Sequence, residues 1–277
     1  MFAIVRRTRP AWLACVVVAS SCSRAADSTA ATGAAGVELV VYAATSTRDA
    51  FQALEADYER SHAVDLVFNF GSSGDLAKQI VAARKADVFL SAGEKELDEV
   101  AAAGLVIEGT RRPLLTNQLV VIEPSALESL FTEPFEPAQL ADARVEHLSL
   151  AHTETVPAGR YAKAWLEKIG VWPQVASRVV PGVDVRAALA AVESGAARAG
   201  LVYRTDAALS KRARIVFAVP LAQGPRIVYP LAVLGGPAGR PHEAEALAFA
   251  AWLATSDGLA SFEARGFLPL AASERAK

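Results

Sequence analysis

Residues 68–80, FNFGSSGDLAKQI, contain a strand pattern that gives way to a helix pattern across a short turn. Apolar residues alternate with more polar ones over 64–70, as in a strand with one buried face. After the turn, Leu76, Ile80 and Ala83 recur at the spacing of a helix. The turn itself is made of Gly and Ser, so a nucleophile, a phosphate or another anion are all conceivable uses for it. Gly71 and Gly74 are expected to keep the turn tight.

The same alternation of strand and helix patterns begins at Val37 and continues along the chain. Predicted strands cover 38–44, 64–70, 86–92, 117–124, 147–151, 199–203, 215–220 and 227–234. The order strand–helix–strand–helix–strand at the start of this region predicts a parallel sheet with helices on its faces. The length fits two such α/β units, and no Pro-, Gly- or Ser-rich linker separates them. We therefore expect two lobes between which the chain passes more than once.

The composition is that of a globular protein without a strong charge bias. The chain has 277 residues, of which 28 are Lys or Arg and 30 are Asp or Glu, and its formal net charge is −2. Such a length allows about one or two domains with a sizeable core. Binding of nucleic acid would require a basic patch or stripe, and the sequence shows none. Nucleic acid is therefore not an expected partner.

Residues 1–22 are predicted to be a signal peptide. Arginines at 6, 7 and 9 precede the short apolar run 11–19, and small residues follow it. The run is too short for a transmembrane helix, which needs about 20 apolar residues. The segment ASSC ending at Cys22 is similar to a bacterial lipobox, so Cys22 is a candidate for lipidation, with simple cleavage as the alternative. Residues 23–36 would form a flexible leader, and the mature protein would be periplasmic or lipid-anchored at the cell envelope.

Five short stretches combine a strand end or a helix start with small or hydroxyl residues. They are AATS (43–46), FGSSG (70–74), VPAG (156–159), GVDVR (182–186) and VYRTD (202–206). In the first four, backbone N–H groups at a helix N-terminus would be free, and together with the helix dipole they favour an anion. Each stretch also has a purely structural interpretation: Ser46 and Ser73 are common N-cap residues, and Tyr203 alone is typical of a core aromatic.

A catalytic interpretation finds less support. The sequence GSSGD at 71–75 is close to the nucleophile elbow G-x-S-x-G, but its second Gly comes one place early. A serine hydrolase using Ser73 would also need a His and an acid, and of the four His only His152 follows a predicted strand. P-loop, dinucleotide and HExxH motifs are absent, and the mature chain has no Cys for a structural metal site. We expect no enzyme activity, no cofactor and no metal cation.

Taken together, the stretches resemble the molybdate-binding proteins of bacterial ABC transporters. The resemblance extends from about Glu38 to Phe267. It rests on VYAATSTRDAF, FGSSGDLAKQI, ADVFLSAGEKELDEVAAAGL, NQLVVIEP, VPAGRYAKAWLEKIGVW, DVRAALAAVESG, AGLVYRTDA, YPLAVL and the closing GF. Such an ordered series is far more specific than any one of its parts.

The resemblance implies five contacts to an oxyanion: two serine hydroxyls, two backbone N–H groups and one tyrosine hydroxyl. In this sequence they fall on Ser46, Ser73, Ala158, Val185 and Tyr203. Thr45 is a departure from the family pattern that could add a donor or tighten the pocket, as is Thr47 on the other side of Ser46. Ser72, beside Ser73, is a further possible contact.

The resemblance also implies a fold and a mode of action. It implies an α/β, two-lobed periplasmic-binding-protein fold of the type II-like class, with two parallel or mixed sheets flanked by helices and the ligand in the cleft between lobes. Lobe one would comprise 37–115 and 229–277, and lobe two 116–228. A monomer would close by a hinge around the ligand and then dock on the membrane permease of an ABC importer.

The expected chemistry suits molybdate and tungstate, which are tetrahedral dianions without a proton at neutral pH. Hydroxyl and N–H donors can satisfy them without any acceptor, and oriented amides can compensate their charge without Lys or Arg. Phosphate keeps a proton, so a phosphate site would want a carboxylate. Sulfate has the same charge and shape but is smaller, so a protein for sulfate or another tetrahedral oxyanion is the main alternative, and a serine hydrolase using Ser73 is a remote one.

Overall fold

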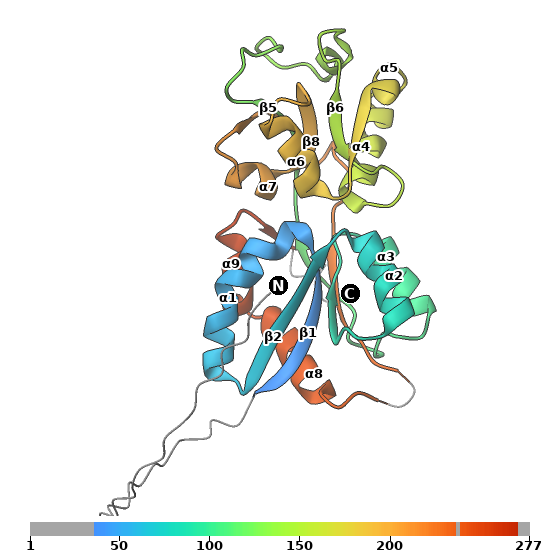
Figure 1. Ribbon diagram of the computed structural model, residues 1–277, viewed down its shortest axis with the longest axis vertical. Helices are drawn as coiled ribbons and strands as arrows, with labels where there is room; N and C mark the ends of the chain where they lie inside the picture. The colour runs from blue at the N-terminus through green and yellow to red at the C-terminus, as the bar shows by residue number, and fades with distance from the viewer. Residues whose placement is uncertain (1–35, 237–238, 271–277) are drawn as a thin grey trace, which may run out of the picture. The chain divides into compact units, whose positions relative to one another are not determined.

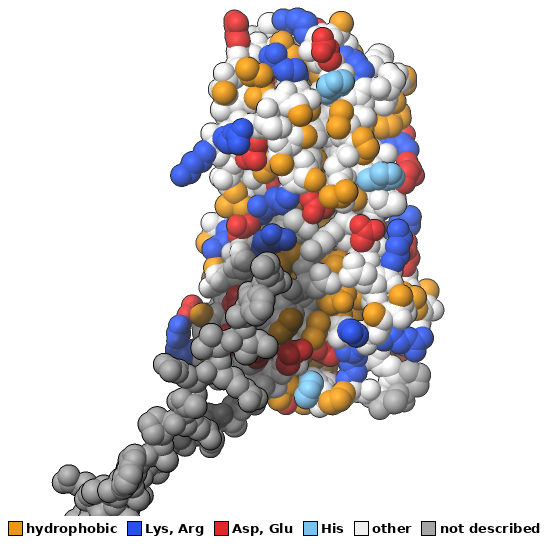
Figure 2. All heavy atoms as spheres, in the orientation of Figure 1, with side chains coloured by type: hydrophobic (Ala, Val, Ile, Leu, Met, Phe, Trp, Pro, Cys, Tyr) orange, Lys and Arg blue, Asp and Glu red, His pale blue; other side chains and the backbone are white. Residues whose placement is uncertain are grey.

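The computed structural model describes residues 36–236 and 239–270. The predicted signal peptide (1–22), nearly all of the leader (23–36) and the lipidation candidate Cys22 lie outside the described residues. Within the described ranges, none of the helices combines the length and apolar character that crossing a membrane requires. On the face drawn in Figure 2, Lys and Arg are interspersed with Asp and Glu.

The first sheet is formed by strands from both ends of the described chain (Figure 1). Its order is β11-β4-β10-β3-β1-β2. The bounds are β1 (Val37–Ala44), β2 (Val64–Gly71), β3 (Val88–Leu90), β4 (Arg112–Thr116), β10 (Tyr229–Val233) and β11 (Leu268–Pro269). β1 pairs in parallel with β2 and β3, as predicted, whereas β10 and β11 pair antiparallel with their neighbours, which makes the sheet mixed.

Helices cover both faces of the first sheet. The apolar sides of α1 (Arg48–Ser61), α8 (Glu243–Leu253) and α9 (Ser256–Glu263) join the larger core, where Phe51, Phe249 and Phe262 are fully buried. The apolar sides of α2 (Ser73–Ala83) and α3 (Glu94–Ala102) form a separate smaller core. α3 ends shortly before Gly104, whose φ of +70° is the left-handed conformation that glycine commonly adopts just after a helix.

The second sheet has the order β7-β6-β8-β5-β9 and is also mixed. Its strands are β5 (Leu119–Pro124), β6 (Leu148–Ala151), β7 (Val179–Gly182), β8 (Ala199–Tyr203) and β9 (Ala213–Ala218). β6 pairs in parallel with β7 and β8, and β5 pairs antiparallel with β8 and β9. The helices α4 (Pro157–Lys168), α5 (Trp172–Val175), α6 (Val185–Glu193) and α7 (Arg204–Leu209) belong to this half of the chain.

The chain passes between the sheets more than once, as expected from the missing linker. It leaves the first sheet after β4 and enters the second at β5, and it returns between β9 and β10. The side chain of Thr116 ties the two passages together, because its hydroxyl donates to the carbonyl oxygen of Ile227 at 2.6 Å. The two-lobed fold with mixed sheets is thus present, while the predicted lobe boundaries at 115/116 and 228/229 stay a prediction.

Three strands that the sequence did not reveal are β4, β7 and the two-residue β11. β4 contains Arg112 and Pro113, and β7 contains Pro181, so neither shows the alternating apolar pattern of a strand. Partners supply the order instead: β4 lies between β11 and β10, and β7 pairs along its whole length with β6.

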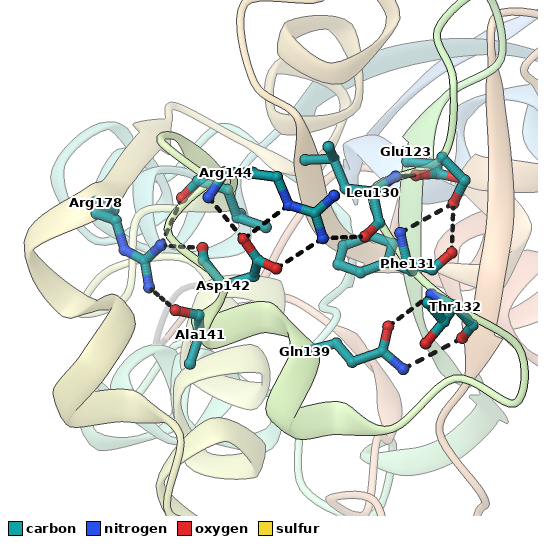
Figure 3. Close-up of polar contacts among 11 residues, drawn as sticks. Glu123, Leu130, Phe131, Thr132, Gln139, Ala141, Asp142, Arg144 and Arg178 are labelled. Carbon is teal, nitrogen blue, oxygen red and sulfur yellow. Dashed lines mark hydrogen bonds and ion pairs between the residues drawn. The ribbon is translucent and has the colours of Figure 1, made fainter.

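The long connection between β5 and β6 (125–147) is held by side chains that bond to its backbone (Figure 3). Gln139 accepts from the N–H of Thr132 at 2.8 Å and donates back to its carbonyl at 3.2 Å. Arg144 donates to Asp142 at 2.8 Å and to the Leu130 carbonyl at 3.1 Å. These bonds order a connection that has only a short 3₁₀ turn of its own, η2 (Pro137–Ala141).

The parallel pairing brings the two serine-containing stretches together. In the register of β1 with β2, Ala44 lies beside Gly71, so Ser46 and Ser73 follow neighbouring strand ends at one edge of the first sheet. In the second sheet, Ala151 lies beside Gly182, so α4 and α6 also begin beyond neighbouring strand ends. Ligands of open α/β sheets bind at such carboxyl ends, and both sheets present theirs to the same cavity.

Candidate oxyanion site

A small cavity is lined by residues from both sheets. The empty space between its lining residues, including the open mouth, is about 230 Å³. The first-sheet wall consists of Ala44, Thr45, Ser46, Gly71, Ser72, Ser73 and Ala92. The second-sheet wall consists of Val156, Pro157, Ala158, Asp184, Val185 and Tyr203. The space suits one compact ligand.

On the first-sheet wall, Ser46 and Ser73 each have a protein partner beside the hydroxyl oxygen. Ser73 Oγ accepts the backbone N–H of Ala92 at 2.9 Å, so its own proton stays available for another acceptor. Ser46 Oγ lies 3.0 Å from the hydroxyl oxygen of Tyr229. Both serines are buried, with 4% and 1% of their surface exposed, so a ligand at this wall would be nearly removed from water.

Ser72 and Thr45 also line the cavity, but their hydroxyls are engaged elsewhere. Ser72 is the N-cap of α2: its Oγ accepts from the N–H of Asp75 at 3.2 Å and donates to the Asp75 carboxylate at 2.7 Å. The cap is therefore Ser72 and not Ser73, which corrects the structural interpretation given to Ser73. The Thr45 hydroxyl donates to Asp184 across the cavity edge at 3.2 Å.

On the second-sheet wall, backbone groups of two helix starts lie at the cavity. α4 begins at Pro157, so Ala158 is its second residue, and α6 begins at Val185 after the cap Asp184. The first N–H groups of a helix have no partner within it, and the dipole places partial positive charge at this end. Ala158 and Val185 can therefore offer N–H groups to an anion whatever their side chains are.

Tyr203 is the last residue of β8, and its ring is 1% exposed. Its hydroxyl is buried without a hydrogen-bond partner among the described residues. Burial raises the pKa of Tyr203 well above its usual range, with nearby Tyr229 as the next cause, so the hydroxyl keeps its proton. A buried, unpartnered donor is costly unless a ligand satisfies it, so the Tyr203 hydroxyl is a candidate donor to a ligand in this cavity.

Asp184 is the one carboxylate among the described residues of the cavity wall. Its Oδ1 accepts from the N–H of Ala187 at 2.8 Å and thereby caps α6, and its Oδ2 accepts from Thr45 at 3.2 Å. Both oxygens are thus bonded to protein donors. Asp184 belongs to the stretch GVDVR, but the sequence did not assign it to the cavity, although Asp before a helix is a recognisable cap.

Two arginines follow the second-sheet donors, and both pair with carboxylates of the first half of the chain. Arg186, next to Val185, bonds to Asp49 of α1 at 2.5 Å and to the buried Asp206 of α7. Arg160, two residues after Ala158, bonds to Glu96 of α3 at 2.6 Å. No Lys or Arg is among the described residues that line the cavity, so compensation of an anion's charge there would have to come from backbone amides and helix ends.

The two walls approach closely at Gly74. A Cβ atom at this position would lie 2.1 Å from the carbonyl oxygen of Thr155, which precedes α4. The φ angle of Gly74 is not positive, so the backbone conformation of the turn does not by itself require a glycine here. Gly74 is needed because the other half of the chain lies where a side chain would be.

The described residues give no support to a catalytic or metal site. No His of the described ranges lines the cavity, and His152 instead contacts Thr155 Oγ1 at 3.1 Å at the surface. Within the same ranges there is also no group of three or more His, Cys, Asp or Glu arranged to hold a metal ion. Ser73 therefore has no neighbouring general base, among these residues, of the kind a serine nucleophile needs.

All five residues taken from the resemblance line one cavity, three of them on the second-sheet wall and two on the first-sheet wall. Two residues that support the wall were missed: Tyr229, which contacts Ser46, and Asn117, which contacts Tyr229 at 3.3 Å. Tyr229 lies 183 residues from Ser46 in the sequence, and no local pattern could have linked them.

Comparison with known proteins gives consistent relatives. Residues 39–268 match the family described as bacterial extracellular solute-binding protein. The molybdate-binding protein ModA of Escherichia coli is 36% identical over 200 residues, which are 72% of this chain and 78% of that protein. YvgL of Bacillus subtilis, provisionally named an ABC transporter substrate-binding lipoprotein, is 35% identical over 232 residues, 83% of this chain and 86% of that protein. The solved structure of the Azotobacter vinelandii periplasmic molybdate-binding protein has a TM-score of 0.72 at 24% identity and covers 84% of this chain and 100% of its own, which shows a shared fold.

Proposed function

The chain belongs to the bacterial extracellular solute-binding proteins, and from this premise we propose that it binds molybdate, and tungstate in the same way. What such a family binds is the transported solute and not a cofactor, and its members are binding proteins, so the expectation of a non-enzymatic protein is confirmed. Relatives named as molybdate-binding support the choice of ligand.

One observation carries the proposal: the cavity offers hydrogen-bond donors from both sheets, and its hydroxyl groups can donate to a ligand without needing to accept a hydrogen bond from it. Ser73 already accepts from Ala92, and Tyr203 has a proton without a partner among the described residues. The N–H groups of Ala158 and Val185 add donors from two helix starts. A tetrahedral dianion without a proton needs this set, and the helix ends compensate its charge.

Asp184 bears on the competing ligand phosphate, which keeps a proton and would want an acceptor. Both Asp184 oxygens accept from protein donors, at 2.8 Å and 3.2 Å, so the carboxylate is committed to the cap of α6 and to Thr45. We therefore expect phosphate to bind more weakly than molybdate. Sulfate matches molybdate in charge and shape, so its exclusion depends on the size of the cavity.

Release to a transporter follows from burial of the site. The donors are at most 4% exposed, so a ligand enters and leaves only when the two walls separate. The passages β4–β5 and β9–β10 are the natural hinge, since only they connect the sheets in the described chain. In this proposal a monomer closes on the oxyanion, docks on the membrane permease of an ABC importer and opens there.

Delivery to the cell envelope is part of the same proposal. The predicted signal peptide would direct export, and Cys22 would anchor the mature chain through a lipid; the Bacillus subtilis relative is named as a lipoprotein. Replacing Cys22 by Ser should move the protein from the membrane fraction to the soluble envelope fraction. A wild-type protein already found in the soluble fraction would overturn lipidation without affecting the ligand.

Isothermal titration of the purified protein with molybdate, tungstate, sulfate and phosphate tests the ligand. We expect molybdate and tungstate to bind tightly with one site each, and sulfate and phosphate to bind at least about a hundredfold more weakly, a difference of about 2.7 kcal/mol. Sulfate that binds as tightly as molybdate would overturn the specificity and favour the sulfate alternative. Ester hydrolysis that disappears in Ser73→Ala would revive the hydrolase alternative.

A further inference from the structure

The contact between Ser46 and Tyr229 has a direction that decides what the site can recognise. The oxygens are 3.0 Å apart, and by distance alone either could be the donor. If Ser46 donates to Tyr229, it presents a lone pair to the cavity. If Tyr229 donates to Ser46, the serine proton is free to point at a ligand. The surrounding bonds distinguish the two cases.

The donor and acceptor in these hydrogen bonds can be assigned by beginning with a backbone N–H, which can only donate. The N–H of Gln118 lies 2.9 Å from Oδ1 of Asn117, so this side of the amide is its oxygen. The opposite side is therefore the NH₂ group, which donates to Thr205 Oγ1 at 2.9 Å and to the Tyr229 hydroxyl oxygen at 3.3 Å. The amide of Asn117 is 2% exposed, so water does not compete for these bonds.

Tyr229 thus accepts from Asn117, and its own proton needs an acceptor. Its ring is fully buried, and among the described residues its hydroxyl contacts only Ser46 and Asn117. Burial raises the pKa of Tyr229, so the proton stays on the phenol. Because Asn117 already donates here, the Tyr229 proton goes to Ser46, and the Ser46 proton is left for the cavity.

We propose that Tyr229, oriented by Asn117, is a positioning residue that holds Ser46 as a hydrogen-bond donor and so makes the site selective for oxyanions that carry no proton. This inference rests on the proposed function, since it needs an oxyanion in the cavity. Tyr229 does not line the cavity and would act only through Ser46. Ser73 reaches the same state by a different route, through the N–H of Ala92.

The series of hydrogen bonds from Asn117 through Tyr229 to Ser46, which we call the relay, lies where the polypeptide passes between the two sheets. Asn117 stands between β4 and β5, and Tyr229 is the first residue of β10. The bond from Thr116 to the Ile227 carbonyl joins the same two passages at 2.6 Å. The donor state of Ser46 is therefore fixed by the hinge region and not by the turn that contains the serine.

A double-mutant cycle with Ser46→Ala and Tyr229→Phe tests the relay, with molybdate affinity as the readout. Tyr229→Phe alone should weaken molybdate about three- to tenfold, the scale of one hydrogen bond. In the Ser46→Ala background the same change should have almost no effect, because the group it positions is gone. An equal loss in both backgrounds would overturn the relay and leave only a structural role for Tyr229.

Asn117→Asp gives a second test that reverses the relay with an isosteric side chain. One oxygen of the introduced carboxylate would still accept from Gln118, and the other would accept from Tyr229, so Ser46 would have to donate to Tyr229 and offer a lone pair to the cavity. The negative charge of the introduced Asp would lower the affinity for molybdate and for dianionic phosphate to the same degree. At about pH 8 phosphate is mostly a dianion that keeps one proton, so the ratio of molybdate to phosphate affinity should fall at least about fivefold. An unchanged ratio would overturn the proposal.

Tyr58→Phe is the matched control. Tyr58 is also a buried tyrosine, 2% exposed, on α1 of the first half of the chain, and its hydroxyl has no part in the relay. Thermal unfolding of each variant shows whether it is folded before binding is compared. If Ser46→Ala and Tyr203→Phe leave molybdate binding unchanged, the proposed function itself fails. If they weaken it while the cycle is additive, only the relay fails.

Discussion

The two walls of the cavity present donors in different ways. The first-sheet wall offers side-chain hydroxyls, Ser46 and Ser73, whose oxygens are already bonded by protein donors. The second-sheet wall offers backbone N–H groups of Ala158 and Val185 and a single hydroxyl, that of Tyr203, which has no partner among the described residues. Side-chain donors depend on residue identity and on a supporting bond, whereas backbone donors depend only on where a helix begins.

This contrast between side-chain and backbone donors predicts which substitutions the candidate site can tolerate. Replacing Ser46 or Ser73 by a residue without a hydroxyl removes a donor outright. At Ala158 or Val185 the donor survives any change that leaves the helix start in place, because every residue but Pro has the N–H.

Replacing Gly74 by Ala should break the contact between the walls. The added Cβ would lie 2.1 Å from the Thr155 carbonyl oxygen, so the walls could not approach as they do here. We expect molybdate affinity to fall more than about a hundredfold, or about 2.7 kcal/mol, with little change in the unfolding temperature. Titration calorimetry and thermal unfolding measure the two quantities.

Gly71→Ala is the control for this prediction. Its Cβ would meet only the flexible end of the Leu76 side chain, at 3.2 Å, so a loss within about threefold is expected there. Equal losses at Gly71 and Gly74 would show that the turn, and not the approach of the walls, is what matters.

Deleting a side chain on each wall tests the contrast directly. Ser73→Ala removes a donor and leaves the buried N–H of Ala92 without its acceptor. We therefore expect molybdate binding to weaken by about 1–3 kcal/mol, which is roughly five- to 150-fold in affinity. Ala158→Gly keeps the backbone N–H and should change affinity by less than about threefold. A large loss in Ala158→Gly would mean that the second-sheet wall does not act through its backbone.

Tyr203→Phe should change affinity and stability in opposite directions. The hydroxyl is buried and has no partner among the described residues without a ligand, so removing it should leave the unfolding temperature of the free protein unchanged or slightly higher. The liganded protein loses one donor, so molybdate affinity should fall about five- to tenfold. Affinity equal to that of the wild type would remove Tyr203 from the site.

The ion pair between Arg186 and Asp49 should contribute least. It joins α6 to α1 at 2.5 Å, but both side chains are partly exposed, at 27% and 37%. Asp49→Asn should therefore weaken molybdate only about two- to threefold, and the loss should shrink as salt is raised. A loss that is independent of salt would point to a packing role for Asp49 in place of an electrostatic one.

Local patterns in the sequence were enough to find most elements of the first sheet. The alternation before FGSSG and the helical spacing after it correspond to β2 (Val64–Gly71) and α2 (Ser73–Ala83). The same kind of pattern identified AGLVY as β8 without an error in either bound. β2 and α2 have clear apolar periodicity, and β8 is a short continuous apolar run, so these segments can be recognised without their partners.

Other elements depended on their neighbours. β4 and β7 each contain a Pro, and β4 also contains Arg112 and Thr116. Both form strands because adjacent strands pair with them. The cap of α2 was assigned to the wrong serine, since Ser72 and Ser73 are both good caps by type. Only the bond from the Asp75 N–H to Ser72 Oγ distinguishes the two.

Local spacing and the family resemblance were enough to predict the residue types of the candidate site and the strand ends on which they lie. The contacts that hold those residues in place became visible only in the folded chain. The bond between Ser46 and Tyr229, the approach of Gly74 to Thr155 and the pairing of Arg186 with Asp49 join positions 81 to 183 residues apart. Such contacts arise from the packing together of segments that are far apart in the sequence, and no local pattern records it.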